Sequence, residues 1–395
     1  MNIPKLRFKE FNDEWIKIDL STCFEYFSTN SLSREQLSDH GIIKNIHYGD
    51  VHKKYGNVVD VENDVAIYIK DAEQINKYEF CCENDIIFAD ASEDYDGIGK
   101  AIELINVNEK LVSGLHTIHA RDKKQFFSPL FKGYYFNTPI IHNKIRILAN
   151  GFKVFGISRD NINNLKVMLP SKQEQEKIAK LLSLLDKKIQ LQTKKIEALK
   201  LFKSYTKSEI FKNGNHVCKL GVILNKWNKK NKDGAINYVE SISNKAGFIP
   251  QSEQFEDRNV ASKNLRNYYV IKKGVFGYNP SRLNVGSLAL KENDFISVVS
   301  PLYECFTTTQ NNTYLFEWFN SNNFKKETFS KFEGGVRNTL NFNNLCDIPI
   351  NLPDIETQNQ YAKYFNKINF KISLEEQKLS ELVKFKKGLL QEMFI

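Results

Sequence analysis

Residues 169–179 read LPSKQEQEKIA, and residues 352–362 read LPDIETQNQYA. These stretches belong to a longer self-match, in which residues 151–211 align with residues 334–394 without a gap, at an offset of 334 − 151 = 183. A gapless self-match of this length indicates an internal duplication. We therefore expect two similar parts in the chain, which perform similar tasks at a fixed separation.

Each copy has the pattern of a long coiled-coil helix, because apolar residues recur in steps of three and four. In the first copy the positions on this spacing are Ile178, Leu182, Leu185, Ile189, Gln192, Ile196, Leu199, Lys203, Thr206 and Ile210. In the second copy they are Tyr361, Phe365, Ile368, Ile372, Glu375, Leu379, Leu382, Lys386, Leu389 and Met393. A Leu-Pro pair and a serine or aspartate that can cap a first turn precede each run. The pattern predicts helices over residues 171–212 and 354–395, each roughly 60 Å long at about 1.5 Å per residue.

Two such helices in one chain most simply bury each other's apolar faces. An antiparallel pairing is favoured because it closes the chain into a compact body with pseudo-twofold symmetry. A coiled coil between two copies of the chain is the alternative. The predicted fold is of the α/β (α+β) class, with two globular domains separated by two long antiparallel coiled-coil helices. The predicted bounds of these parts are 1–170, 171–212, 213–353 and 354–395.

The two globular segments, residues 1–170 and 213–353, lack the helical spacing. They contain short β-branched and aromatic runs, for example at residues 85–89 and 268–271, which predict short strands in mixed domains. Outside their shared ends the two segments hardly resemble each other in sequence. We therefore expect the helices and the adjoining turns to be duplicated, and the two heads to differ.

The 395 residues are 41% apolar and 26% charged, as is typical of a globular protein with two or three domains. We expect no membrane span, no signal peptide and a reduced cytoplasmic location, since no apolar run is long enough and the six cysteines lack metal-binding spacing. The net charge is +9. Residues 171–212 carry 11 Lys against 5 acids, or +6, and residues 354–395 carry 7 Lys against 6 acids, or +1. The two predicted helices therefore differ in charge.

Both heads contain side chains that suit contacts with DNA, because Arg and Lys bind guanine edges or phosphates, Asn pairs with adenine, and hydroxyl groups bind phosphates. In the first head the candidates are Ser92, Lys100, His116, Thr117, His119, Arg121 and Lys153. In the second head they are Tyr278, Asn279, Ser281, Arg282, Asn284, Arg337 and Asn338. Ordinary turns and structural histidines are the alternative interpretation of the same residues.

No catalytic motif accompanies these clusters. Residues 97–100, GIGK, lack the spacing of a phosphate-binding loop, and residues 156–160, GISRD, do not form a nucleophile elbow. A nuclease-like set can be chosen from Asp85, Glu93 and Lys100, but such sets are common in charged proteins. We expect no catalytic residue, no metal site and no cofactor bound by this chain.

Two unlike heads, each followed by a repeated Leu-Pro-x-x-x-x-Gln helix, resemble the specificity subunit of type I restriction-modification enzymes over essentially the whole chain. Residues 169–179 with 185–189 (LDKKI) carry the resemblance most specifically, and residues 352–362 are a weaker echo. Four segments in the heads are also similar to this family: 4–8 (PKLRF) through Trp15, 113–117 (SGLHT), 278–282 (YNPSR) and 300–303 (SPLY). The second copy departs from the family pattern at Thr357 and Asn369.

The resemblance implies two target-recognition domains, each of which reads one half of a split, asymmetric site in double-stranded DNA. The helices would act as a spacer ruler and dock two methyltransferase (modification) subunits, which methylate adenine with S-adenosylmethionine. Two restriction subunits would translocate and cut unmethylated DNA with ATP and magnesium. The chain itself would be a non-catalytic cytoplasmic subunit. The alternative from another class is a coiled-coil adaptor whose heads bind proteins.

The residues expected to join the helices to each other and to the modification subunits belong to the repeated stretch. They are Gln175, Ile178, Leu182, Leu185, Ile189, Ile196, Leu199, Gln358, Phe365, Ile368, Ile372, Leu379 and Leu382.

Overall fold

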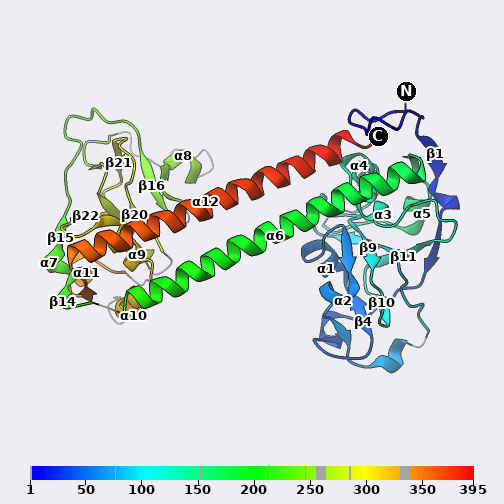
Figure 1. The fold of residues 1–395 in the computed structure, drawn as a ribbon, viewed down its shortest axis with the longest axis horizontal. Helices are drawn as coiled ribbons and strands as arrows, with labels where there is room; N and C mark the ends of the chain where they lie inside the picture. The colour runs from blue at the N-terminus through cyan, green and yellow to red at the C-terminus, as the bar shows by residue number, and fades with distance from the viewer. Residues whose placement is uncertain are drawn as a thin grey trace. The chain divides into compact units, whose positions relative to one another are not determined.

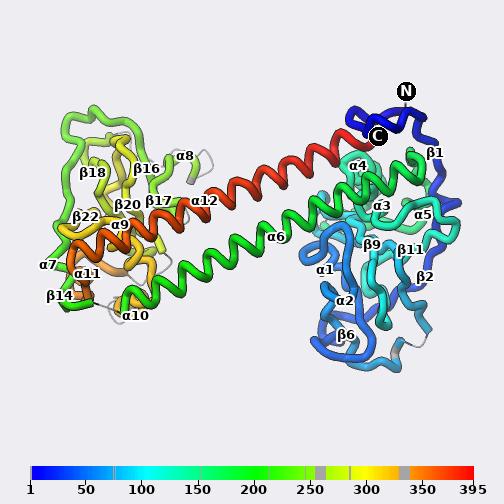
Figure 2. The backbone as a smooth tube through the Cα atoms, viewed as in Figure 1, coloured from blue at the N-terminus to red at the C-terminus, as the bar shows by residue number. Residues whose placement is uncertain are grey.

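The computed structural model describes residues 2–75, 77–151, 153–212, 214–244, 246–254, 264–283, 286–329 and 339–395. The chain divides into two compact units, one made of Met1–Thr193 with Lys378–Ile395 and the other of Lys194–Gln377. The long helices α6 (Lys172–Ile210) and α12 (Ile355–Glu392) each contribute one part to each unit (Figures 1 and 2). Both helices lie within the residue ranges predicted from the repeated spacing.

The head of the first unit contains a five-stranded sheet of order β2-β11-β7-β9-β5 and a four-stranded sheet of order β10-β4-β6-β3. Its strands are β1 (Ile16–Asp19), β2 (Phe24–Phe27), β3 (Leu37–Ser38), β4 (Lys44–Ile46), β5 (Val58–Asp60), β6 (Tyr68–Ile69), β7 (Ile86–Ala89), β8 (Ala91–Ser92), β9 (Ala101–Ile105), β10 (Leu111–Ser113), β11 (Thr117–Asp122), β12 (Phe155–Gly156) and β13 (Lys166–Leu169). Its helices are η1 (Leu20–Thr22), η2 (Arg34–Gln36), α1 (Tyr48–Lys53), α2 (Val61–Asp64), η3 (Ala72–Ile75), α3 (Phe131–Phe136), α4 (Pro139–Leu148) and α5 (Arg159–Asn163).

The core of the first unit joins the head to both long helices. Aromatic side chains of α3, all of them buried, pack in one apolar cluster with Leu182 of α6 and Leu389 of α12. The segment before β1 also contacts these helices. The ring of Trp15 lies edge-on to Phe394, with 6.3 Å between the ring centres, and Arg7 donates two hydrogen bonds to the carboxylate of Glu174, at 2.8 and 2.7 Å. Burial of these aromatic surfaces is the main favourable contribution to the stability of the unit.

The head of the second unit contains a four-stranded sheet of order β15-β22-β19-β20, the hairpin β16-β17 and the pair β18-β21. Its strands are β14 (His216–Lys219), β15 (Leu224–Lys226), β16 (Glu240–Ser243), β17 (Gly247–Pro250), β18 (Tyr269–Ile271), β19 (Phe276–Tyr278), β20 (Leu288–Leu290), β21 (Ser297–Val299), β22 (Glu304–Thr308) and β23 (Pro349–Leu352). Its helices are α7 (Leu220–Ile223), α8 (Gln251–Gln254), α9 (Asn312–Phe319), α10 (Asn322–Phe329) and α11 (Phe342–Cys346).

The two heads share a strand order that their sequences do not reveal. The order β2-β11-β7-β9 in the first head corresponds to β15-β22-β19-β20 in the second, and neighbouring strands are antiparallel in both. The strand that opens each head pairs with the strand that leads into its long helix, with Ile16 opposite Leu169 and His216 opposite Leu352. The expectation that only the helices and adjoining turns are duplicated is therefore wrong. Strand order persists because many sequences can satisfy the same sheet.

The apolar face predicted for each long helix points away from solvent. All ten positions on the three-and-four spacing of α6, and all ten of α12, are buried or half-buried. Within the second unit, Lys195 pairs with Glu375 at 3.0 Å, and the hydroxyl groups of Thr206 and Tyr364 lie 3.4 Å apart. Residue numbers rise along one helix while they fall along the other, so the two helix segments of this unit are antiparallel.

Across the described part of the chain, no helix combines the length and apolar character needed to cross a membrane.

Candidate nucleic-acid interface

The predicted clusters occupy equivalent positions in the two heads. In the first head, residues 90–94 follow β7 and residues 113–117 lead into β11. In the second head, residues 279–282 follow β19 and residues 300–303 lead into β22. Because these strands are antiparallel neighbours, both segments of a head lie at the same end of its sheet. Equivalent loops therefore carry different side chains in the two heads.

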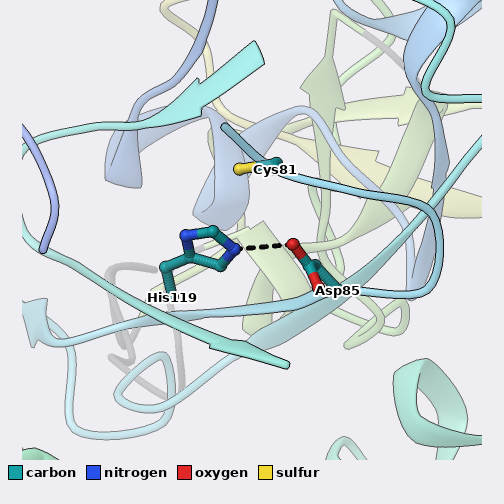
Figure 3. Close-up of side chains that lie close together, drawn as sticks. All are labelled: Cys81, Asp85 and His119. Atoms are coloured by element: carbon teal, nitrogen blue, oxygen red, sulfur yellow. Dashed lines mark hydrogen bonds and ion pairs between the residues drawn. The ribbon is translucent and has the colours of Figure 1, made fainter. Parts of the chain in front are cut away.

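Three of the residues predicted to contact DNA are committed to bonds inside the first head. His119 is fully buried, and its Nε2 lies 2.7 Å from the carboxylate of Asp85 (Figure 3). Arg121 donates to the same carboxylate through Nε and Nη2, both at 2.8 Å. Thr117 is buried and donates its hydroxyl proton to the carbonyl of Gly114. These side chains hold the loops in place, and we remove them from the proposed DNA contacts.

Asp85 is the centre of this buried network. Its carboxylate also accepts the backbone N–H of Cys82 at 2.7 Å. Burial alone raises the pKa of Asp85, but the hydrogen bonds from Arg121 and His119 outweigh burial, so that this pKa lies below its ordinary value. A buried carboxylate with several donors is stable in its charged form, and it orients the strand that carries His119 and Arg121.

The Sγ of Cys81 lies in the same place, and with Asp85 and His119 it forms a group whose nearest ligand atoms are within 4.8 Å of one another (Figure 3). The chemistry of the group favours an ion-pair network over a metal site. Arg121 already supplies the positive charge that the Asp85 carboxylate requires. Burial raises the pKa of the Cys81 thiol well above its ordinary value, whereas a metal ligand must be a thiolate.

A partly exposed aromatic cluster surrounds His116. This histidine is half exposed and has a φ of +55°, in the left-handed region that residues other than glycine rarely adopt. Its ring lies edge-on to Tyr48, with 5.3 Å between the ring centres, and its Nδ1 lies 3.3 Å from the carboxylate of Asp90. His52 packs against Tyr48 at 6.1 Å. Backbone strain that carries an exposed polar side chain is common at binding sites, so this cluster is the best candidate for base reading in the first head.

Sequence reasoning missed Tyr48 and His52 because they come from α1, far from His116 along the chain. A weak signal was available, since a tyrosine and two histidines recur over residues 47–52. Burial raises the pKa of Asp90, although the imidazole of His116 opposes this effect. Asp90 and His116 together supply a hydrogen-bond acceptor and an aromatic edge at the surface.

Two other predicted residues support this surface from inside the head. Lys100 donates to the carbonyl groups of His52 and Tyr55, at 3.2 and 2.8 Å, and burial lowers its pKa. Ser92 is buried, and its hydroxyl accepts a backbone N–H of the turn that follows. The nuclease-like set suggested by the sequence is not assembled, because Asp85 and Lys100 are each bonded elsewhere. Lys153, by contrast, is exposed in the loop before β12.

The predicted residues of the second head divide between core and surface. Tyr278 is fully buried on β19, and Asn279 shapes the following turn by accepting the backbone N–H of Ser281 at 3.0 Å. Ser281 and Arg282 are exposed beyond this turn and remain candidates for DNA contact. The other predicted residues lie outside the described part of the chain: Asn284, Arg337 and Asn338.

Gln175 and Gln358 join each long helix to its own head. The backbone N–H of Ser128 donates to Oε1 of Gln175 at 2.8 Å, and that of Asn311 donates to Oε1 of Gln358 at 3.2 Å. Each glutamine also donates from Nε2 to the carbonyl of the proline that precedes its helix, at 3.1 and 2.9 Å. Both glutamines are buried. Each glutamine therefore fastens the first turn of its helix to its own head.

The other residues predicted for docking are buried or half-buried on the apolar faces of the two helices: Ile178, Leu182, Leu185, Ile189, Ile196, Leu199, Phe365, Ile368, Ile372, Leu379 and Leu382. Several large apolar side chains are exposed elsewhere on the two helices, and four of them lie at positions that the duplication relates. They are Leu191 and Phe385 in the first unit, and Leu374 and Phe202 in the second, where 374 − 191 = 183 and 385 − 202 = 183. Single exposed apolar residues are common, so the recurrence at related positions is what distinguishes these four.

Comparison with known proteins assigns a family to part of the chain and a fold to all of it. Residues 12–201 match the family model of the type I restriction modification DNA specificity domain. No curated protein matches the chain in sequence. The crystal structure of the type I restriction-modification system S subunit from M. genitalium superposes with a TM-score of 0.61 at 14% identity, covering 100% of this chain and 99% of that chain. A chain from a structural study of complex assembly and conformational transition of the type I R-M system superposes with a TM-score of 0.55 at 13% identity, covering 95% and 96%.

Proposed function

Because residues 12–201 belong to the family of type I restriction-modification DNA specificity domains, and the whole chain has the fold of a type I S subunit, we propose that this chain is the DNA-reading subunit of such a system. Each head reads one half of a split site in double-stranded DNA. The single observation that carries this proposal is the pair of equivalent loops, after β7 and after β19, that present different side chains from the same strand order.

The difference between the two heads supports an asymmetric site. The first head offers the imidazole and phenol groups of His116 and Tyr48, whereas the second offers the guanidinium and hydroxyl groups of Arg282 and Ser281. Arg favours the O6 and N7 acceptors of guanine, a pairing that the imidazole and phenol groups of the first head do not offer. Two heads with different donors read two different base sequences, so the full site is not palindromic.

The matched apolar residues support the docking of two copies of one partner. Leu191 with Phe385, and Leu374 with Phe202, give each unit the same exposed pair. A duplicated surface binds two copies of the same protein, and in this class of system that protein is the modification subunit. S-adenosylmethionine is then used by the modification subunits, and ATP and magnesium by two restriction subunits. The present chain supplies DNA recognition and no chemical step.

The two long helices support a ruler role for the chain. An antiparallel helix pair of 39 and 38 residues links the heads through continuous backbone hydrogen bonds, which resist bending far better than a loop. The spacing between the two half-sites then follows from helix length, and not from the sequence of either head.

Sequencing of methylated DNA from a host that carries the chain with its modification subunit tests the proposal. We expect one new bipartite, non-palindromic motif with a methylated adenine in each half, and a purified assembly with two modification subunits for each copy of this chain. A chain that self-associates, leaves host methylation unchanged and shows no preference among DNA duplexes would instead be the coiled-coil adaptor.

A further inference from the structure

We propose that a lysine-lined cavity in the second unit binds phosphate groups of the DNA backbone. The cavity has a volume of about 260 Å³ and is lined by residues of α6, of the turn between α9 and α10, and of the start of α10. Its charged residues are Lys200, Lys203, Lys207 and Lys325, and every other lining residue is a serine or an asparagine. The inference rests on the proposed function, because it names the part of the DNA that this site contacts.

The spacing of the lysines suits a strand of DNA. Lys200, Lys203 and Lys207 are three and four residues apart, so they lie on one side of α6, while Lys325 faces the same cavity from α10. At about 1.5 Å of rise per residue, the three lysines of α6 extend over roughly 10 Å. Neighbouring phosphates of one strand lie roughly 7 Å apart, because the strand winds around the DNA axis as it rises, so this length suits contacts with about two of them.

Carboxylates neutralise only part of this positive charge. The buried Glu317 accepts hydrogen bonds from Lys203 and Lys207, at 2.6 and 3.1 Å, and Glu376 pairs with Lys200 at 2.6 Å. Four lysines against two carboxylates leave a charge of 4 − 2 = +2. Glu317 does not line the cavity, so it orients the two lysines without filling the space that a phosphate would occupy. For Lys325, no carboxylate partner occurs among the described residues.

The lining favours nucleic acid over a protein partner. Protein interfaces are enriched in aromatic residues, Met and Arg, and depleted in Lys and Ser. This cavity has the opposite composition, with no aromatic, aliphatic or acidic side chain in its lining. Ammonium, hydroxyl and amide groups are the donors that proteins use for phosphate oxygens. The occupant we infer is therefore the DNA backbone, and not an acidic segment of a partner subunit.

The duplication supplies a natural comparison, because the first unit lacks the cavity's charges. At the offset of 183 residues, Lys200 corresponds to Val383, Lys207 to Leu390, and Lys325 to His142. Of the four lysines, only Lys203 has a lysine counterpart, Lys386. Lys200 and Lys207 thus contribute part of the excess positive charge of α6, at positions where the first unit has apolar residues. We expect the DNA beside the half-site of the second head to be held more strongly by its backbone.

The test uses the full chain in the assembly in which it is purified, with fluorescein-labelled duplexes of the methylated site and of a scrambled sequence. Binding is measured by anisotropy over a series of KCl concentrations for the wild type, for K200Q/K325Q, and for the control K384Q/K387Q, which removes two exposed lysines from the first unit. The slope of log K against log[KCl] is negative, and it should become less steep by about 2 in K200Q/K325Q, at about 0.9 per lost phosphate contact. The affinity for both duplexes should fall about tenfold, with their ratio unchanged. The control should keep the wild-type slope.

An unchanged slope in K200Q/K325Q, or an equal loss in the control, would overturn the proposal. It would also be wrong if K200Q/K325Q kept its slope but no longer co-purified with modification subunits, because the cavity would then bind protein. A wild-type assembly with no preference between the two duplexes contradicts the proposed function, which is a separate outcome. All four substituted lysines are exposed, so melting temperatures should match the wild type within the error of the measurement.

Discussion

At the scale of single residues, each unit has a polar junction where its head meets a long helix. The two junctions use equivalent positions, but the acidic residue lies on the helix in one unit and on the head in the other. In the first unit the acid is Asp186 on the helix, which accepts hydrogen bonds from Tyr134 of the head, at 2.9 Å, and from Lys386, at 2.5 Å. In the second unit the acid is Glu317 of the head, and 317 − 134 = 183. There the helix position of Asp186 is taken by Asn369, which donates to Glu317 at 3.1 Å. Each junction therefore keeps one carboxylate beside the repeated lysine, which is Lys386 in the first unit and Lys203 in the second.

This exchange explains why the second copy departs from the family pattern at Asn369. An aspartate there would place a second carboxylate beside Glu317, and two like charges in a partly buried site are unfavourable. The two junctions are thus equivalent in function and not in sequence. Asn369 looks like a lost acid of the repeat, but Glu317 of the head supplies the carboxylate in its place.

We expect Glu317→Gln to lower the free energy of unfolding by about 2–4 kcal/mol, because it leaves two partly buried lysines without their carboxylate. Urea unfolding of the full chain measures this effect. Glu376→Gln is the matched control, since it breaks an exposed pair with Lys200 and should cost less than about 0.5 kcal/mol. Equal effects of the two substitutions would show that burial of the junction is unimportant.

The same junction makes stability depend on pH. Burial alone raises the pKa of Glu317, but Lys207 and Lys203 outweigh burial, and the pKa lies below its ordinary value. A carboxylate with a lowered folded-state pKa contributes stability that is complete above its unfolded pKa of about 4.3 and is lost as the pH falls through the folded value. The difference in stability between wild type and Glu317→Gln should therefore be constant near neutral pH and shrink as the pH falls below about 4.

At the scale of elements, each long helix has one buried face and one face with exposed apolar residues. One face is buried against the head and the other long helix within its unit, and another exposes the matched apolar pairs. Under the proposed function, the face that exposes the matched pairs is the one that binds a modification subunit.

Phe202→Glu and Phe385→Glu should each release one modification subunit. A buried charge at the centre of an apolar interface costs several kcal/mol when unpaired, and the two faces are independent. Mass measurement of the purified assembly should give one modification subunit for each single variant and none for the double variant. The control is Lys384→Glu, an exposed position next to Phe385 along the same helix. Loss of both subunits from either single variant would contradict two separate docking faces.

The ruler role predicts that spacing follows helix length. Four residues inserted after Lys195, together with four after Gln377 in the antiparallel partner, add about 6 Å, or roughly two base pairs of DNA. We expect the methylated motif to keep both half-sites and to lengthen its spacer by this amount. Four residues inserted between Asp233 and Gly234, in a turn of the second head, should leave the spacer unchanged. An unchanged spacer in the double insertion would show that helix length does not set the distance between the half-sites.

At the scale of the whole molecule, the chain consists of one architectural plan used twice with different heads. Each unit contains its own core, its own strand pair at the base of the long helix and its own glutamine contact between helix and head. The heads should therefore be exchangeable as modules.

Replacing residues 213–353 with the second head of another specificity subunit should change one half-site only. The first half-site and the spacer should stay as in the wild type, because β1–β13, α6 and α12 are untouched. Sequencing of methylated DNA from cells with the hybrid measures all three features at once. A change in both half-sites would show that the two heads read DNA jointly.

The amino-acid sequence by itself determined the long helices, their apolar faces and the duplication, because these depend on local spacing and on identities at a constant offset. Strand runs such as 85–89 were predictable as well, since β-branched and aromatic residues are concentrated there.

Only the tertiary structure decided which polar residues face solvent. His119 and Arg121 have the composition of a DNA-binding pair, yet both bind a buried aspartate that lies more than thirty positions earlier in the chain (119 − 85 = 34). Gln175 and Gln358 look like docking residues, yet both bind their own heads. The shared strand order and the lysine cavity depend on contacts between distant segments. The local sequence shows which residue types recur at which spacing. The burial and the bonding partners of a residue depend instead on the distant segments that pack against it.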